Sequence, residues 1–188
     1  MKTNGRRSSV DTRARILGAA RRLFSKNGYE RTTIRAVATA ADIDPSMVMR
    51  YFVNKERLFT AAATIDLKFP DLSDLPRRNA GIAIIEHFLK LWEGPLSGKG
   101  LDVLLRSAVT HKAAAKRMQD VFQRQTLPFL QQFCSPEQAQ ECAALIVTQL
   151  LGLAYTRHVV RLPAVVALSQ VVIRKRVGAT IQAYLEMR

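Results

Sequence analysis

Two short helical patterns separated by a turn of three residues constrain this fold more than any other feature of the sequence. Between residues 34 and 41 the apolar side chains recur every three or four residues, which is the spacing of one face of a helix. Asp44 followed by Pro45 predicts the start of the next helix, because Asp caps free amide groups and proline fits the first helical turn. The short turn forces the two helices to cross steeply, so the pair is predicted to form a helix-turn-helix unit.

Two further helices flank this pair, so residues 11–68 are predicted to hold four helices. The first begins near residue 11 and ends at Gly28, because glycine suits the left-handed conformation found just after a helix. Thr32 or Thr33 caps the second helix, and Asn54 caps the fourth. Val48 and Phe52 are expected to face inward from the third helix, which leaves its opposite face for a partner.

The rest of the chain predicts longer helices and no sheet. After a polar break at residues 69–79, helices are expected over residues 80–93, 99–110, 112–133, 137–161 and 164–187. Pro128 lies inside the third of these and should kink it. No alternating strand pattern of useful length is present, so the prediction is an all-α protein of about nine helices. Its expected parts are a flexible basic arm (1–10), the helix-turn-helix domain (11–68) and a C-terminal domain (69–188).

The charge indicates a polyanionic partner. The 29 Lys and Arg residues exceed the 15 Asp and Glu residues, giving a net charge of +14. Residues 1–69 hold 14 basic and 6 acidic residues, so the charge is densest in the N-terminal part. Nucleic acid and an anionic membrane surface both fit, and a merely solubilising surface stays open as an alternative. The apolar run at residues 142–155 is interrupted and is judged too short to span a bilayer, so the protein is expected in the cytoplasm.

The outer face of the third helix has the size and chemistry to enter the major groove of DNA. Arg50 is predicted to bond guanine, with a phosphate contact as the alternative. Lys55 stands at a helix N-terminus, where free amide groups already favour a phosphate. The basic arm is expected to track the minor groove or to remain an unstructured tail. The residues predicted to contact DNA are Thr33, Arg35, Pro45, Ser46, Met47, Met49, Arg50, Tyr51 and Lys55.

Residues 12–64 resemble the tetracycline-repressor (TetR) family of bacterial transcription regulators. The resemblance rests on Gly28-Tyr29 after the first helix and on Tyr51-Phe52 followed by Asn-Lys-Glu. Residues 80–188 resemble the family in architecture, and QLLGLAYTRHVVRLP is similar to stretches of its actinobacterial members. Asp42 departs from the glycine usual in the turn, and Asp tolerates a left-handed backbone better than most residues. The resemblance implies a ligand-responsive repressor in which Tyr51 bonds a DNA phosphate.

One helix-turn-helix unit makes few contacts with bases, so a two-fold dimer on a near-palindromic operator is expected. Residues 143–155 are apolar almost all round, which predicts that the last two long helices pair between subunits. Burial inside one larger domain is the alternative. The predicted interface residues are Leu150, Leu151, Gly152, Ala154, Val171 and Val172.

The family also implies an effector pocket, for which the sequence offers an aromatic-rich set of residues. These are His87, Phe88, Leu91, Trp92, Phe122, Thr126, Phe129, Tyr155 and His158. They would suit a small apolar or aromatic effector, and plain core packing is the alternative.

Two alternatives to a regulator are an enzyme and an architectural protein. For an enzyme, the sequence offers no nucleophile–base pair at usable spacing, no phosphate-binding glycine loop and no metal cluster, so neither a cofactor nor a metal is expected. An architectural protein that binds nucleic acid without sequence preference would also fit the charge.

Overall fold

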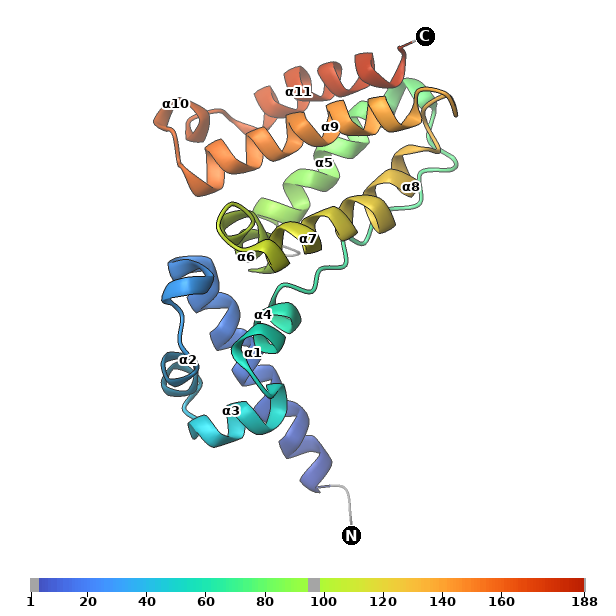
Figure 1. Cartoon of the computed structure of the whole chain (residues 1–188). Coiled ribbons are helices and arrows are strands. Elements are labelled where there is room, and N and C mark those ends of the chain that lie inside the picture. Colours follow the sequence, from blue (N-terminus) through green and yellow to red (C-terminus); the bar gives the residue numbers. More distant parts are fainter. Residues whose placement is uncertain (1–3, 95–98, 188) are drawn as a thin grey trace. The chain divides into compact units, whose positions relative to one another are not determined.

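The computed structural model describes residues 4–94 and 99–187, and within these ranges the regular structure is entirely helical, which confirms the all-α fold. The chain divides into two compact units (Figure 1). Unit 1 contains the chain up to Ile65 together with Lys99–Met118, and unit 2 contains Asp66–Gly98 and Gln119–Arg188. The predicted boundary at residue 68 is therefore incomplete, because a later segment of the chain returns to unit 1.

Unit 1 is built around one long helix. Its helices are α1 (Asn4–Arg31), α2 (Ile34–Ala41), α3 (Pro45–Phe52), α4 (Lys55–Ala62), α6 (Lys99–Ser107) and the start of α7 (Lys112–Val121). Gly28 interrupts α1 with a φ of 75°, so the predicted helix end is present as a kink. Phe24 and Phe59 meet edge to face in the core, with ring centres 5.2 Å apart. The helices α2, α4 and α6 all pack on α1.

The predicted arm of residues 1–10 is wrong from Asn4 onward, because α1 begins there. Residues 1–3 lie outside the described residues. No proline or glycine follows Gly5 before Gly18, and extending an existing helix adds one hydrogen bond per residue without a new nucleation step. The inclusion of α6 in unit 1 also has a simple cause. Leu101 and Leu104 on α6 are buried, and the helix supplies apolar surface that α1 needs beyond what α2 and α4 cover.

Unit 2 is a helical bundle in which α5 (Ala80–Glu93) packs along α11 (Gln170–Leu185), with α9 (Ala139–Ala154) against both (Figure 1). Its shorter segments are η1 (Arg77–Asn79), η2 (Phe122–Thr126), α8 (Leu127–Leu130), η3 (Tyr155–Val159) and α10 (Pro163–Val166). The backbones of α5 and α11 approach so closely at Gly81 that a side chain there would overlap the carbonyl oxygen of Gly178. Ile85, Ile146, Ile173 and Ile181 form the fully buried core.

Two of the predicted long helices are divided. The wide π-helical turn η2 precedes Pro128, which cannot donate a backbone hydrogen bond and would crowd a regular helix. The predicted helix 164–187 stops after α10 and restarts at Gln170, because the Ser169 hydroxyl accepts a bond from the amide of Val172 and caps a new helix. A periodicity argument overlooked this serine because the apolar pattern continues across it.

One helical segment, Ala139–Val159, is long and apolar enough by length and composition to cross a membrane, contrary to the length estimate from the sequence. The estimate was too short because it stopped at residue 155, whereas the π-helical turn η3 continues the helix. Ala143 and Ile146 on this segment are fully buried within unit 2, whereas 28% of its most apolar window is buried.

Candidate nucleic-acid interface

The helix-turn-helix unit of α2 and α3 is fixed by side-chain caps at both helix starts. The Thr33 hydroxyl accepts a bond from the amide of Ala36 at 3.1 Å, so Thr33 rather than Thr32 is the cap. Asp44 accepts from the amide of Ser46 at 2.8 Å, and Pro45 stands in the first turn as expected. Asn54 likewise caps α4 through the amide of Arg57 at 2.8 Å.

The turn adopts the left-handed backbone that Asp42 was expected to tolerate, with φ 52° and ψ 56°. Arg15 of α1 holds this turn from outside, since its guanidinium donates to the carbonyl oxygens of Ala41 at 2.8 Å and Asp42 at 3.0 Å. No local sequence pattern indicates this contact, because the partners lie 26 and 27 residues away. A basic residue that was counted as surface charge therefore orients the two helices.

The third helix separates an inner from an outer face as predicted. Val48 is fully buried and Phe52 is 4% exposed, whereas Met49 is 43% exposed. Pro45, Ser46 and Arg50 are also exposed, and Met47 is partly buried. These outer residues form one continuous strip, which we call the α3 strip: Pro45, Ser46, Met49 and Arg50.

Two members of this region are engaged by their own chain. The Ser46 hydroxyl donates to the carboxylate of Asp44, and the two hydrogen bonds from Ser46 lower the pKa of Asp44. Asp44 therefore stays ionised beside the α3 strip. Arg50 lies over the ring of Tyr51, with 5.8 Å from its guanidinium carbon to the ring centre.

The three residues expected to bind phosphate differ in the contacts that their side chains make within the chain. Thr33 is exposed. The Tyr51 hydroxyl donates to the hydroxyl of Ser9 on α1 at 3.2 Å. The Lys55 ammonium donates to the carbonyl oxygen of Glu30 at 3.1 Å and lies 4.3 Å from the ring centre of Tyr29. Arg35 is exposed on α2.

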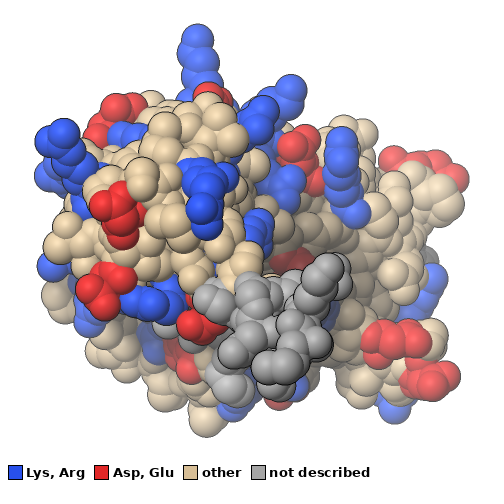
Figure 2. Space-filling model, turned by 90° about the horizontal axis from the view of Figure 1, so that it is seen from below, with Lys and Arg blue, Asp and Glu red and all other residues tan. Residues whose placement is uncertain are grey.

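Positive charge is not gathered in one patch on the face shown in Figure 2. On the face shown in Figure 2, Lys and Arg side chains project at several separate places, with Asp and Glu between them. In unit 1 a hollow of about 400 Å³ is lined by Arg21, Arg22, Ser25, Lys26, Asp102 and Arg106. The net charge alone therefore does not single out the α3 strip, whose case rests on its geometry.

Five of the nine residues predicted to line an effector pocket lie in two aromatic groups in unit 2. In the first, Phe69 stacks on Phe129 with ring centres 4.1 Å apart, and His87 lies 5.3 Å from Phe69. Nε2 of His87 is 2.8 Å from the carbonyl oxygen of Leu67, and burial lowers the pKa of this histidine despite that bond. This group is core packing, which was the alternative for each of these residues.

The second group contains Trp92, which stacks on His158 at 4.9 Å and lies 6.0 Å from Phe88. Tyr155 is 42% exposed, and Leu91, Phe122 and Thr126 are partly buried. A hollow of about 410 Å³ in unit 2 is lined by none of the nine predicted residues; its lining is Arg77, Phe133, Gln182, Leu185 and Glu186. The assignment of the nine residues to an effector pocket therefore stays a prediction, and this hollow does not support it.

Most of the predicted interface residues lie at the surface of unit 2. Val171 is 68% exposed and Val172 is 43% exposed, Gly152 is exposed, and Leu150 and Leu151 are partly exposed. Ala154 is fully buried within the chain, so its assignment to an interface is wrong. A small residue on an apolar helix fits a close contact inside the bundle as well as one between subunits.

The capped helix pair and the exposed α3 strip define a helix-turn-helix protein of the DNA-binding kind. Residues 16–62 match the family described as "Bacterial regulatory proteins, tetR family", and residues 79–185 match "Tetracyclin repressor-like, C-terminal domain". The chain belongs to the TetR family of bacterial transcriptional regulators.

Curated relatives are similar in the N-terminal part. The HTH-type transcriptional regulator UidR of Escherichia coli K12 is 36% identical over 61 residues, which are 32% of this chain and 31% of that protein. The HTH-type transcriptional repressor KstR of Mycobacterium tuberculosis is 40% identical over 58 residues, 31% of this chain and 26% of that protein. The matches thus span about a third or less of the length of these relatives.

Solved structures are similar over nearly the whole chain. NalD, the secondary repressor of the MexAB-OprM multidrug efflux pump in Pseudomonas aeruginosa, superposes with a TM-score of 0.71 at 21% identity, covering 95% of this chain and 97% of that one. A TetR-like transcriptional regulator from Rhodococcus sp. RHA1 gives a TM-score of 0.68 at 19% identity, covering 93% of both chains. At these sequence identities the likeness shows a shared fold alone.

Proposed function

We propose that the protein is a homodimeric transcriptional repressor of the bacterial cytoplasm that binds a near-palindromic operator and is released by a small apolar or aromatic effector. The observation that carries this proposal is the α3 strip. Val48 and Phe52 anchor α3 in the core while Met49 and Arg50 project outward, as a helix that enters a major groove requires.

Base recognition is assigned to the exposed end of α3. Arg50 would donate two bonds to guanine, worth about 1–3 kcal/mol of discrimination against another base. Met49 would pack on a thymine methyl group, with Met47 behind it. Ser46 keeps its bond to Asp44 in this scheme and contributes through its position at the first turn.

Phosphate binding is assigned to Thr33, Tyr51 and Lys55, with Arg35 beside them. On binding DNA, the Lys55 ammonium would leave the Glu30 carbonyl oxygen and donate to a phosphate oxygen. The Tyr51 hydroxyl would likewise leave the Ser9 hydroxyl and donate to a phosphate oxygen. Both exchanges are favourable because a hydrogen bond to an ionised acceptor is stronger than one to a neutral acceptor. Ser9 on α1 then lies next to the DNA backbone, which extends the interface toward the N-terminal end of α1.

Two copies are needed because one α3 strip carries few base contacts. In a two-fold dimer the two strips would enter successive major grooves about 34–36 Å apart. The exposed apolar residues of α9 and α11, including Leu151, Val171 and Val172, supply a surface for this pairing.

The effector is assigned to the surroundings of Trp92, His158 and Tyr155. Trp92 is the single tryptophan of the chain, so its fluorescence reports on that group alone. We expect aromatic carboxylates, amides and polycyclic compounds to be distinguished by quenching titrations. This part of the proposal would be wrong if no apolar or aromatic compound at millimolar concentration changed the fluorescence of Trp92.

A second candidate function is architectural binding without sequence preference, which the net charge of +14 favours. Selection of bound DNA from a random pool separates the two. For a repressor we expect a palindromic consensus bound at least ~10³-fold more tightly than scrambled DNA at physiological salt. A ratio near one would establish the architectural alternative.

Single substitutions then test the assignment of residues. Arg50→Ala should relax preference at one base pair in each half-site, whereas Tyr51→Phe and Lys55→Ala should weaken binding to consensus and scrambled DNA alike. Lys90→Ala, which removes an exposed charge from α5 in unit 2, is the matched control. Equal, sequence-independent losses for Arg50→Ala and Lys55→Ala would withdraw base recognition by Arg50.

A further inference from the structure

The one-turn helix α10 in unit 2 is apolar and almost wholly exposed. Among its four residues, Val165 alone is partly buried. The exposed apolar side chains of α10 and its surroundings are Val160 (47%), Leu162 (43%), Val166 (38%), Leu168 (39%), Val171 (68%) and Val172 (43%). Burial of its own side chains therefore contributes little to holding α10 in place.

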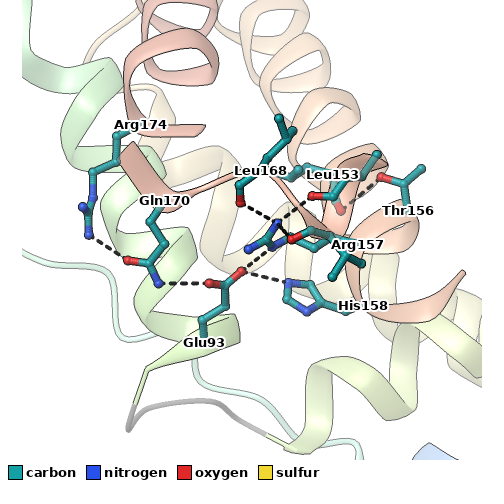
Figure 3. A network of polar contacts seen from close by, with 10 residues as sticks. Glu93, Leu153, Thr156, Arg157, His158, Leu168, Gln170 and Arg174 are labelled. Carbon is teal, nitrogen blue, oxygen red and sulfur yellow. Dashed lines mark hydrogen bonds and ion pairs between the residues drawn. The ribbon is translucent and has the colours of Figure 1, made fainter. Parts of the chain in front are cut away.

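A partly buried arginine, Arg157, holds this turn instead (Figure 3). One nitrogen of the Arg157 guanidinium donates to the carbonyl oxygens of Val165 at 2.6 Å, Val166 at 3.1 Å and Leu168 at 3.0 Å. Carbonyl groups at the end of a helix lack partners within it, and a cationic side chain is well suited to them. The end of α10 is thereby fixed to the π-helical turn η3, on which Arg157 stands.

Arg157 is itself fixed by Glu93 at the end of α5. Its Nε lies 2.6 Å from Glu93, and the two side chains are 13% and 18% exposed. The second carboxylate oxygen of Glu93 accepts from Gln170 at 2.9 Å, and His158 Nε2 is 3.7 Å from the first oxygen. The network therefore joins α5, η3, α10 and α11 through groups that have several polar contacts each.

A largely buried ion pair is a poor way to gain stability, because apolar side chains of similar volume often stabilise as much or more. What such a pair adds is a single defined geometry, since both charges must keep their partners. The wide turn η3 is consistent with this role, because isolated π-helical turns occur frequently at functional sites.

The absence of charge on the exposed surface indicates what would cover it. Residues 162–173 contain no charged residue, in a chain whose net charge is +14. DNA or an acidic protein would be met by Lys and Arg side chains. A second copy of the same basic chain would be repelled by them, so an uncharged apolar surface suits self-association. This surface is also continuous with Val171 and Val172 on α11, which the proposed dimer already uses.

We propose that Arg157 and Glu93 are positioning residues of the subunit interface, which hold α10 so that its apolar side chains contact the second copy. This inference rests on the proposed homodimer and extends its interface from α9 and α11 to α10. It also assigns to two charged residues a function at a surface that they do not themselves reach.

The test measures the dimer dissociation constant of the full chain by sedimentation over a range of protein concentrations. Glu93→Gln and Arg157→Met are expected to raise it by about tenfold or more, the effect of roughly 1.4 kcal/mol. Glu86→Gln is the matched control, because Glu86 lies on the same helix and pairs with Arg174 at 3.6 Å in an exposed position. It should leave the constant within about twofold, as surface ion pairs contribute little.

A second variant separates positioning from folding. Arg157→Lys keeps a positive charge beside Glu93, so its helix content should equal that of the wild type. Its ammonium group does not span three carbonyl groups, so its dimer should be weaker than that of the wild type but stronger than that of Arg157→Met. A wild-type protein that stays monomeric would remove the proposed homodimer. A wild-type dimer that Glu93→Gln and Arg157→Met leave unchanged would remove the positioning role alone. Loss of helical circular dichroism in both Arg157 variants would assign the pair to folding and also overturn this inference.

Discussion

Unit 1 and unit 2 are both helical, but they differ in how their helix starts are held and in the length of chain that their longest polar contacts span. Unit 1 also has long-range contacts, such as the 42 residues between Ser9 and Tyr51, but the starts of α2, α3 and α4 are fixed locally. In unit 1 the caps of α2, α3 and α4 join residues two or three positions apart. In unit 2, α5 and α9 begin without a side-chain cap bond. Its main polar contacts join Glu93 to Arg157, 64 residues on, and Gly81 to Gln182, 101 residues on.

This difference matches the tasks we propose for the two units. A surface that must present a few side chains to a rigid duplex benefits from helices whose ends are fixed locally. A surface that must pair with its copy and respond to a ligand depends on contacts among several helices, because those contacts can be redistributed. Substitutions in unit 1 should therefore act locally, whereas substitutions in the network of unit 2 should spread.

The largest effect is expected in the aromatic core of unit 1. Phe24 is fully buried, and its ring meets those of Phe59 at 5.2 Å and Tyr29 at 6.0 Å. Phe24→Ala should lower the free energy of unfolding of unit 1 by about 3–5 kcal/mol, because the lost ring leaves a cavity. Urea unfolding followed by circular dichroism measures the loss.

The control for this prediction is Met49→Ala on the exposed face of α3, which should change stability by less than about 0.5 kcal/mol. Hydrogen exchange should show the loss of protection in Phe24→Ala confined to unit 1. Equal loss of protection in α5 and α11 would show that the two units unfold together, and the contrast between them would fail.

The second prediction concerns the acid dependence of unit 2. Burial alone would raise the pKa of Glu93, but hydrogen bonds from Arg157 and Gln170 outweigh burial and lower that pKa. A carboxyl group whose pKa is lower in the folded state adds stability above its unfolded value of about 4.3, and this is lost as the pH falls through the folded value. Glu93→Gln should cost about 1–3 kcal/mol at pH 7 and less at pH 3.

Urea unfolding of wild type and Glu93→Gln at pH 7, 5, 4 and 3 measures this difference. The shared acid dependence of Asp44 and Asp71, whose pKa values are also lowered by hydrogen bonds, cancels in the comparison. A difference between the two proteins that stays constant down to pH 3 would show that the Glu93 charge does not stabilise unit 2.

The third prediction separates the cap of α3 from its charge. Asp44→Ala should destabilise unit 1, because the bond to the amide of Ser46 is lost. Asp44→Asn keeps an acceptor of equal capping strength and should leave the stability of unit 1 close to that of the wild type. Without the carboxylate, Asp44→Asn should bind scrambled DNA more tightly than wild type in a low-salt titration. Weaker binding by this variant would place α3 away from the phosphates.

The same contrast explains how much the sequence could predict. In unit 1 the caps Asp44 and Asn54, the choice of Thr32 or Thr33 as the third cap, and the turn at Asp42 were predicted, because each acts on backbone only a few residues away. The identity of the family also came from this part of the chain, where short-range patterns are dense. The contact of Arg15 with the turn was missed, since its partners are distant in sequence.

In unit 2 the prolines and apolar periodicity predicted α5 and α9 closely. The break at Ser169, which divides the last predicted helix, was not predicted, because the apolar periodicity continues across it. Five of the nine predicted pocket residues lie in two separate groups, because the rotation of each helix about its axis depends on long-range packing. Arg157 and Glu93 were overlooked for the same reason. The residues next to a charged residue in the sequence do not indicate which distant carbonyl groups its side chain will contact.

The smallest effect is expected at Val53, which joins α3 to α4 and tests whether local backbone geometry in unit 1 carries strain. Its φ is 64° with ψ −49°, and the amide of Asn54 bonds the carbonyl oxygen of Phe52 at 2.7 Å in a three-residue γ-turn. A β-branched residue is strained at positive φ, whereas glycine is not. Val53 is 53% exposed, so its side chain contributes little by burial.

Val53→Gly should therefore raise the free energy of unfolding by about 0.5 kcal/mol, since relief of strain slightly exceeds the greater freedom of glycine in the unfolded chain. Val10→Gly is the matched control: Val10 is 67% exposed but lies within α1, so glycine there should destabilise by about 0.5–1 kcal/mol. Opposite signs for two exposed valines, measured by urea unfolding, would show that the chain in unit 1 is held by its local conformation. Equal losses at both positions would mean that the γ-turn is relaxed with valine in place, and that α3 is oriented by its caps and by Arg15 without strain at its end.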